Sequence, residues 1–350
     1  MNILTGTLLI DGSQGEGGGQ ILRTGLALSA LLERPVKFYN IRANRKNPGL
    51  RPQHLTSVKA LTEITGAKTE GAHQGSPELF FSPEAIKGGS YRFDVQTAGA
   101  TSLVVAAILP ALLFAPERSE VTICGGTHVP FSPPFHYLAD IFLPMLGRMG
   151  SRVDINLRRW GWYPKGRGRI DLTIEPCRSL DPFCHDKRGD LRGLELLIGL
   201  ARLPSHIADR QANHVAERMA RAGLALMTRI ETVPSLDPGS FVFVKAVFDR
   251  TTAGFSALGR KGKPAEAVAE EAVGDFFDFL RSNGSVDRYL SDQLLPYMAL
   301  AGGTSCFRTE VFSSHLLTNI AIIEEFLPVR FSLDKSKGEV SVTGAGILPG

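Results

Sequence analysis

The chain has 350 residues, a formal net charge of +4 and a sequence pI near 8.9. Hydrophobic residues make up 43% and charged residues 21%, which is ordinary for a soluble globular protein of about two domains. No apolar run approaches the length of a bilayer and no pair of the four cysteines has CxxC spacing, which excludes a transmembrane helix and a zinc site built on such pairs. We expect a cytoplasmic protein with reduced thiols, whose mild positive charge is compatible with a nucleic-acid partner.

One order of elements recurs three times along the chain. The first unit has a glycine-rich turn, an apolar helix, a strand and a second helix, at residues 15–20, 21–32, 36–43 and 53–65. The second unit repeats this order at residues 97–102, 103–114, 120–126 and 135–150. The third has a helix, a strand and a helix at residues 291–303, 305–312 and 315–327. The matched order predicts a true repeat, and the most apolar helix, 103–114, should be buried beneath a sheet.

The segment between the second and third units predicts an inserted α/β domain. Strands are expected at residues 194–201, 228–233, 241–248 and 254–259, and helices at residues 205–223 and 264–282. The two helices carry more charge than those of the repeats, as expected where one face meets water. We therefore predict a mixed α/β fold with a large domain of residues 1–182 and 283–350 and a smaller inserted domain of residues 183–282.

The densest glycine stretch, residues 12–24, opens directly onto a helix. Glycine allows backbone N–H groups to converge on an anion, and a helix N-terminus adds partial positive charge. The spacing matches neither GxxxxGK[ST] nor GxGxxG, so a phosphate loop of another type and a turn needed only for packing both remain open. Glu16 favours the phosphate loop, because a carboxylate beside a phosphate requires a divalent cation between them. Glu16 is therefore a candidate magnesium ligand, and Arg23 could reach a phosphate.

A second segment, residues 41–54, follows a strand and precedes a helix. Arg42, Arg45, Gln53 and His54 lie at its edge, where forked guanidinium groups can bind phosphate. Solvated loop residues with no ligand are the alternative.

Near the C-terminus, His315 should lie in the first turn of the last repeat helix, with Ser314 as the N-cap. The helix dipole there disfavours the imidazolium, which favours a neutral, nucleophilic ring. A histidine that attacks phosphorus forms a reactive phosphoramidate. Spacing alone favours a structural or capping histidine over a nucleophile.

Five segments together resemble the RNA 3′-terminal phosphate cyclase family, from about Leu9 to the C-terminus. They are DGSQGEGGGQILR (11–23), RANRKNPGLRPQH (42–54), WGWYPKGRGRI (160–170), YLSDQ (289–293) and HLLTN (315–319). The resemblance implies three βαβαββ-type repeats in a large, enolpyruvyl transferase-like domain, with a smaller α/β domain inserted between the second and third repeats. It also implies an ATP-dependent ligase that acts on RNA with a 3′-phosphate end. His315 would take AMP from ATP, AMP would pass to the RNA 3′-phosphate, and the vicinal 2′-OH would close a 2′,3′-cyclic phosphodiester.

The resemblance also implies roles for individual residues. Arg23, Arg42 and Arg45 would neutralise phosphate charge, and Glu16 with Asp292 would hold Mg²⁺ or Mn²⁺. The remaining ATP-binding residues would be Tyr289, Leu290, Ser291, Gln293, Gln53, Phe255 and Pro133, with Tyr289 and Phe255 against adenine. The sequence departs from the family pattern at three positions, Ala106, His136 and Arg167.

Three other functions compete with the cyclase. A non-catalytic ribosome-assembly factor of the same family would lack the histidine, which is present here. An enolpyruvyl transferase-like enzyme would act on small molecules without a covalent histidine. A bare RNA-binding module would not explain Glu16 within a glycine loop. The oligomeric state is left open.

Overall fold

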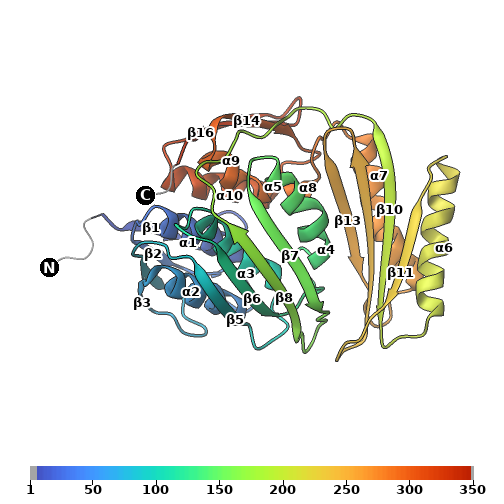
Figure 1. Ribbon diagram of the computed structural model, residues 1–350, viewed down its shortest axis with the longest axis horizontal. Coiled ribbons are helices and arrows are strands. Elements are labelled where there is room, and N and C mark those ends of the chain that lie inside the picture. The colour runs from blue at the N-terminus through green and yellow to red at the C-terminus, as the bar shows by residue number, and fades with distance from the viewer. Residues whose placement is uncertain (1–5, 348–350) are drawn as a thin grey trace.

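The computed structural model describes residues 6–347, which form helices and four-stranded sheets (Figure 1). The first sheet contains β1 (Leu8–Asp11), β2 (Val36–Tyr39), β3 (Lys68–Glu70) and β4 (Leu79–Ser82). The second contains β5 (Gly89–Asp94), β6 (Ser119–Gly125), β7 (Arg152–Arg159) and β8 (Gly168–Glu175). The third contains β9 (Cys184–His185), β14 (Gly302–Arg308), β15 (Phe331–Asp334) and β16 (Glu339–Ala345).

These three sheets share one topology. Their strand orders are β1-β2-β4-β3, β5-β6-β8-β7 and β9-β14-β16-β15. In each sheet the first two strands are parallel, and the other two pair antiparallel with their neighbours. Each parallel pair encloses a helical connection, as parallel pairing requires. The predicted threefold repeat and mixed α/β fold class are therefore confirmed.

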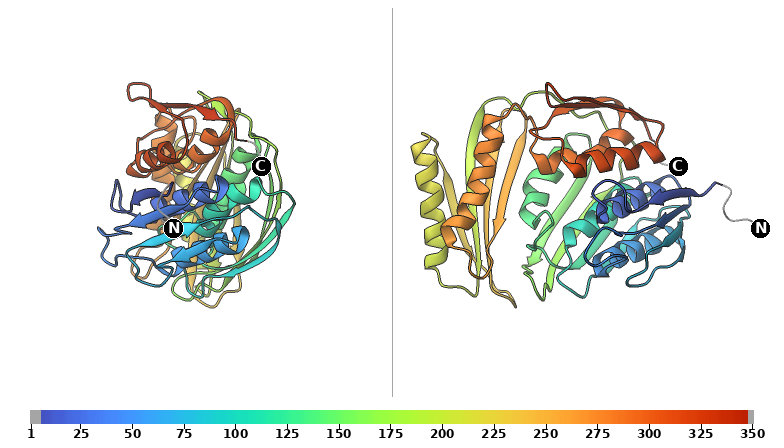
Figure 2. Two further views of the ribbon diagram at one scale, coloured as in Figure 1. Left: turned by 90° about the vertical axis from the view of Figure 1, so that its left-hand side faces the viewer. Right: turned by 180° about the vertical axis from the view of Figure 1, so that it is seen from behind.

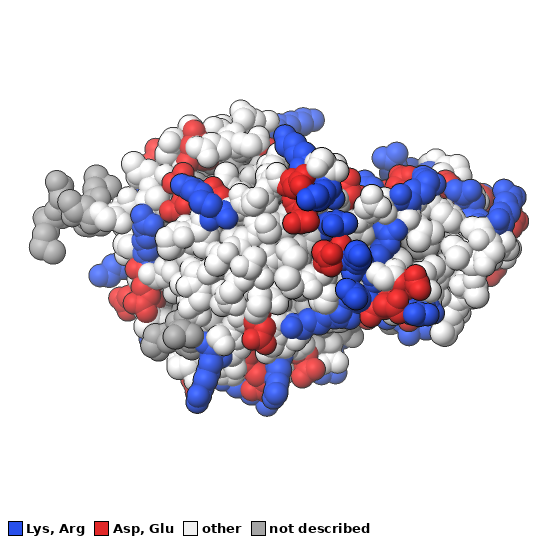
Figure 3. Space-filling model, turned by 90° about the horizontal axis from the view of Figure 1, so that it is seen from above, with Lys and Arg blue, Asp and Glu red and all other residues white. Residues whose placement is uncertain are grey.

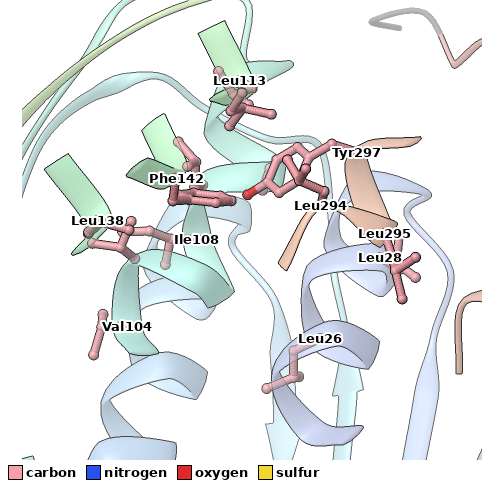
Figure 4. Close-up of a cluster of buried hydrophobic side chains, with 14 of the residues drawn as sticks. Leu26, Leu28, Val104, Ile108, Leu113, Leu138, Phe142, Leu294, Leu295 and Tyr297 are labelled. Atoms are coloured by element: carbon pink, nitrogen blue, oxygen red, sulfur yellow. The ribbon is translucent and has the colours of Figure 1, made fainter. Parts of the chain in front are cut away.

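Helices from the three repeats pack against one another. Their main members are α1 (Gly19–Leu31), α2 (Pro52–Thr65), α3 (Thr101–Leu113) and α10 (Ser314–Phe326). Helix α1 packs against α2, α3 and α10. Figure 4 shows apolar side chains of α1 and α3 near Leu294, Leu295 and Tyr297. Helix α3 is buried along nearly all of its length, as its lack of a polar face predicts.

The inserted segment builds a fourth sheet at one end of the molecule (Figures 1 and 2). Its strands are β10 (Leu191–Ala201), β11 (Met227–Thr232), β12 (Gly239–Phe248) and β13 (Thr252–Leu258), in the order β11-β10-β12-β13. Helices α6 (His206–Arg221) and α7 (Ala265–Arg281) cover one face of this sheet and share a separate hydrophobic core with it. Because this segment has its own core, we propose that it is a domain.

The insertion begins later than the sequence indicated. Cys184 and His185 form β9, which pairs parallel with β14 of the third unit. The inserted segment therefore follows the first strand of the third repeat and does not separate the second repeat from the third. Two residues are too few to show a strand period, so the sequence pattern did not reveal this strand.

Two predicted helices are interrupted at prolines. The helix expected at 135–150 consists of α4 (Phe135–Tyr137), a π-helical turn (Leu138–Phe142) and α5 (Leu143–Gly147). Pro144 has no N–H for the carbonyl of Asp140, and the helix widens there. The helix expected at 291–303 is likewise split into α8 (Arg288–Gln293) and α9 (Leu295–Leu300), with Pro296 in the first turn of α9.

Strand β14 begins at Gly302 because it pairs with β16 from that residue onward. None of the helices between residues 6 and 347 combines the length and the apolar character that crossing a bilayer requires.

Candidate active site

Three segments distant in sequence meet where α1 and α10 begin. The glycine loop before α1 contacts α10, since the Glu16 N–H donates to Thr318 Oγ1 at 3.2 Å. Thr24 of α1 donates to Asn319 Oδ1 at 2.7 Å. The Asn319 amide in turn donates to the Asp292 carbonyl at 2.7 Å. The Asp292 carbonyl is free to accept this bond because the residue four positions later, Pro296, has no N–H to form the usual helix hydrogen bond. The Thr-Asn pair of α10 thus joins the loop and α8.

His315 lies in the first turn of α10, as the sequence predicts. The N-cap is Ser313, whose side chain accepts from the Leu316 N–H at 3.1 Å, and Ser314, predicted as the cap, begins the helix. The helix therefore starts one residue earlier than predicted, because the extended residue that caps it is Ser313. The His315 side chain is 52% exposed, so a bound molecule can reach it.

Gln20 orients the His315 ring. His315 Nδ1 lies 2.6 Å from Gln20 Oε1, and Gln20 Nε2 donates to Asp292 Oδ2 at 3.3 Å. A carbonyl oxygen only accepts, so Nδ1 carries the proton and the neutral ring has its lone pair on Nε2. Gln20 is 7% exposed and held in place. The sequence prediction omitted Gln20, although it closes the GEGGGQ run and begins the helix.

Glu16 lies between Arg45 and His315. Its Oε2 is 2.8 Å from Arg45 Nη2 and 3.2 Å from His315 Nε2, and its side chain is 9% exposed. Arg45 Nη2 also donates to the Glu16 carbonyl at 3.1 Å. An unprotonated Nε2 would face a carboxylate across this short distance, which is unfavourable unless a proton or a cation lies between them. The structure thus brings Glu16 and Arg45, two of the predicted site residues, to His315.

A compact set of donors surrounds the first residue of α1. A Cβ on Gly19 would lie 2.3 Å from His54 Nε2 and 2.8 Å from Arg23 Nη1, so both groups pack against the backbone there. His54 Nδ1 accepts from the Arg51 N–H at 3.1 Å. Burial, followed by Arg23, Arg42 and Arg51, lowers the pKa of His54 to about 3, so the ring is neutral and its Nε2 carries the proton.

Burial also lowers the pKa of Arg23 to about 10, against the opposing influence of Glu16 and Asp292, and Arg23 remains a cation at neutral pH. An N–H donor, a guanidinium and a helix N-terminus therefore converge at Gly19, which suits an anion.

Arg42 and Gln53 have structural partners in this region. Arg42 Nη1 donates to the carbonyls of Asn47 at 2.7 Å and Gly49 at 3.0 Å, which closes its own loop. Gln53 Oε1 accepts from the Ala100 N–H at 3.4 Å and joins α2 to the turn before α3. Gln53 directly precedes His54 in the sequence, and within residues 6–347 neither Arg42 nor Gln53 has a hydrogen bond or ion pair with Glu16 or His315.

The 289–293 segment contributes fewer side chains than predicted. Tyr289 is 43% exposed, and Gln293 Nε2 donates to the Tyr289 carbonyl at 2.7 Å. Leu290 and Ser291 are fully buried, so their predicted contacts with ATP cannot involve their side chains.

Phe255 requires a similar correction. Its ring is 1% exposed and packs against Phe276 and Phe279 in the core of the inserted sheet, so it cannot stack on adenine in this structure. Pro133 accepts from Ser102 Oγ through its carbonyl at 2.7 Å and holds its loop against α3.

Asp292 provides a pH-dependent prediction. Burial raises the pKa of Asp292 from 3.8 to about 7, while the Gln20 hydrogen bond and Arg23 act in the opposite direction. A carboxyl with a higher pKa in the folded chain destabilises the fold as pH rises from about 4 to about 7. We expect Asp292→Asn to gain stability relative to the wild type as pH increases through this range. Urea unfolding at both ends measures the difference, and a pH-independent difference would contradict the assignment.

The three departures from the family pattern lie outside this contact network. Ala106 is exposed on α3, and Arg167 adopts a left-handed φ of 58°. His136 is buried with its Nδ1 3.0 Å from His128 Nε2, and the ring lies against Trp160 and Phe241. This aromatic cluster joins the second repeat to β12.

A cavity of about 370 Å³ opens between the glycine loop and α10. It is lined by Gln14, Gly15, Ser314, Leu317, Thr318, Ala321 and Ile322. Among residues 6–347, no group of three or more His, Cys, Asp or Glu side chains is arranged to hold a metal ion. Any cation at Glu16 would need further ligands from a bound substrate or water.

A glycine loop, the Arg23 guanidinium and an oriented histidine lie at two helix N-termini, an arrangement in an α/β protein that suits phosphate chemistry. The family model of RNA 3′-terminal phosphate cyclase matches residues 14–333. An RNA 3′-terminal phosphate cyclase of Pyrobaculum aerophilum is 43% identical over 97% of this chain and 98% of its own length. That of Thermococcus onnurineus is 44% identical over 95% of this chain and 97% of its own. The chain therefore belongs to the RNA 3′-terminal phosphate cyclase family, and we class it as an enzyme of that type.

A solved structure, the EPSP synthase of Acinetobacter baumannii, shows a distant likeness. It has 14% identity and a TM-score of 0.27, with 60% of this chain and 54% of that chain covered. The cyclase relatives favour the cyclase over the assembly-factor and enolpyruvyl transferase alternatives.

Proposed function

We propose that the protein uses ATP to convert the 3′-terminal phosphate of RNA to a 2′,3′-cyclic phosphodiester through a covalent His315–AMP intermediate. The observation that carries the proposal is the orientation of His315. Its Nδ1 is engaged by Gln20, and its Nε2 faces the glycine loop in a chain of the cyclase family.

In the first step His315 Nε2 attacks the α-phosphorus of ATP. An N–P bond forms, the bond from phosphorus to the bridging oxygen breaks, and pyrophosphate leaves. The ring becomes cationic and keeps its Nδ1 proton, Gln20 Oε1 accepts a hydrogen bond from this Nδ1–H, and Asp292 fixes the Gln20 amide. Arg23, His54 and the start of α1 would bind the negative charge of the triphosphate.

In the second step an oxygen of the RNA 3′-phosphate attacks the phosphorus of the histidine adduct. The N–P bond breaks, His315 is regenerated, and an RNA–(3′)pp(5′)A end forms. In the third step the vicinal 2′-OH attacks the terminal RNA phosphorus, AMP leaves, and the hydroxyl proton passes to solvent. Nucleophile and phosphate share one ribose, so this step needs positioning more than further activation.

The donor set fits a hard divalent cation at Glu16. Carboxylate oxygens are the ligands that Mg²⁺ and Mn²⁺ prefer, and ATP phosphates would supply the others. Such a cation would neutralise phosphate charge and relieve the unfavourable pairing of Glu16 with an unprotonated Nε2. Asp292 is the weaker second ligand, because its raised pKa favours the protonated form below about pH 7.

The exposure of side chains in α8 indicates which of them would contact ATP. Tyr289 is the accessible aromatic ring near α8 and would pack against adenine, with Gln293 beside it. Arg45 would contact phosphate once Glu16 engages a cation.

The RNA end would enter beside His315. The cavity between the glycine loop and α10 has room for a terminal nucleotide, with Leu317 as an apolar surface. Positive charge does not form a single patch on the face seen in Figure 3, where Lys and Arg alternate with Asp and Glu.

The proposal is tested with RNA carrying a labelled 3′-phosphate. We expect ATP and a divalent cation to make the label resistant to phosphatase, and chelation of the cation to prevent this. An RNA whose last ribose is 2′-deoxy lacks the cyclising nucleophile, so it should accumulate the RNA–(3′)pp(5′)A end. Absence of any ATP-dependent product from folded protein would instead favour the non-catalytic alternative.

A further inference from the structure

Two cysteines meet on neighbouring strands of the third sheet. Cys184 of β9 and Cys306 of β14 are directly paired in the parallel register. Their Sγ atoms lie 3.2 Å apart, although the residues are 122 positions apart in sequence. Cys184 is exposed and Cys306 partly exposed, whereas Cys124 and Cys177 are buried. The first two thiols are therefore both close together and accessible.

The backbone geometry suits a disulfide. Neighbouring strands lie about 4.8 Å apart, and disulfides join residues whose Cα atoms are roughly 4.4–6.8 Å apart. Forming the bond of about 2.05 Å needs only a small inward rotation of the two side chains. A metal centre is not the better explanation, since residues 6–347 contain no group of three His, Cys, Asp or Glu suited to a metal ion.

We propose that Cys184 and Cys306 are a redox-active pair that forms an intramolecular disulfide on reaction with a small disulfide such as oxidised glutathione. The Cys184 thiolate attacks the small disulfide and releases one small thiol. Cys306 then attacks the mixed disulfide at Cys184 and releases the second. The two protein thiols lose two electrons and two protons in total, and the small disulfide gains both.

Local charges favour this order of attack. Burial, Cys184 and the acidic side chains of Glu339 and Asp186 raise the pKa of Cys306. Cys306 is therefore the slower thiolate to form, and the more exposed Cys184 is the first nucleophile. Ring closure should accelerate as the pH is raised.

The bond would enclose the entire inserted segment. β9 has two residues and is held by few backbone bonds, such as that from the Cys306 N–H to the Phe183 carbonyl at 2.7 Å. Closing so long a loop restricts the unfolded chain, which stabilises the folded one. The pair would therefore link the entry of the inserted segment to the strand that leads toward His315, independently of the proposed reaction.

The test uses full-length reduced protein equilibrated with oxidised glutathione at mildly alkaline pH. Free thiols are then alkylated in denaturant and the protein is analysed by mass spectrometry. We expect two of the four cysteines to escape alkylation, a linked Cys184–Cys306 peptide, and a Tm higher by roughly 5–10 °C that reductant reverses. Cys184→Ser should abolish the linked peptide and the rise in Tm, while Cys177→Ser should retain both. Four alkylated thiols, glutathione adducts without the linked peptide, or only links between molecules would overturn the proposal.

Discussion

Replacing His315 with alanine is expected to abolish ATP-dependent cyclisation, with a loss of roughly 10³-fold or more in kcat. The side chain supplies the nucleophile, and neither Gln20 nor Glu16 can replace it because both are held as acceptors beside the ring. Gel or chromatographic analysis of labelled RNA measures the effect. The substitution is at a half-exposed position, so the fold should persist.

A pre-activated substrate provides the control for this variant. RNA that already carries the (3′)pp(5′)A end bypasses His315, so His315→Ala should still cyclise it at a rate close to that of the wild type. If the variant failed on this substrate while remaining folded, His315 would have a role beyond AMP transfer. If it cyclised RNA 3′-phosphate with ATP as well as the wild type does, the proposed nucleophile would be wrong.

Replacing Gly19 with alanine is expected to lower kcat/KM for ATP by about 10²-fold or more. The added Cβ would lie 2.3 Å from His54 Nε2 and 2.8 Å from Arg23 Nη1, so both donors must move away from the start of α1. His54 cannot retreat freely, because its Nδ1 is bonded to the Arg51 N–H and its ring is buried. Steady-state kinetics with varied ATP measures the loss.

Gly274→Ala is the matched control. Gly274 lies within α7, and a Cβ there meets nothing within 4 Å. This substitution should leave kcat/KM unchanged and raise the stability by about 0.5–1 kcal/mol, since alanine favours a helix over glycine. Equal kinetic effects of the two substitutions would show that the donors at Gly19 do not bind ATP.

The threefold repeat was predictable because its helices are long and strongly periodic. Helix α3, with its nearly unbroken apolar surface, is the clearest case. Short strands such as β3 and β9 have too few residues to show the alternation of a strand. They can be recognised only in the structure, from their hydrogen bonds to neighbouring strands. Prolines 144 and 296 could have signalled the broken helices, because each removes a helix hydrogen bond.

The candidate site was predictable where motifs carry several charged groups. Glu16, Arg45 and His315 were each singled out from such motifs, but the sequence did not show that His315 would contact Glu16, which lies far from it in the chain. Gln20 was missed because a single glutamine has no distinctive chemistry until its partners are known. Phe255 was misplaced, although Ala253 and Ala257 on the same strand face already indicated a core position.

The covalent intermediate is tested most directly by incubating the protein with [α-³²P]ATP and Mg²⁺ or Mn²⁺, without RNA. The account predicts that label remains on the denatured wild-type protein, is lost in acid, is stable in alkali, and is absent from His315→Ala. Adding RNA 3′-phosphate should discharge the label. A folded wild-type protein that acquires no label under these conditions, or a variant that acquires as much as the wild type, would contradict the histidine–AMP mechanism.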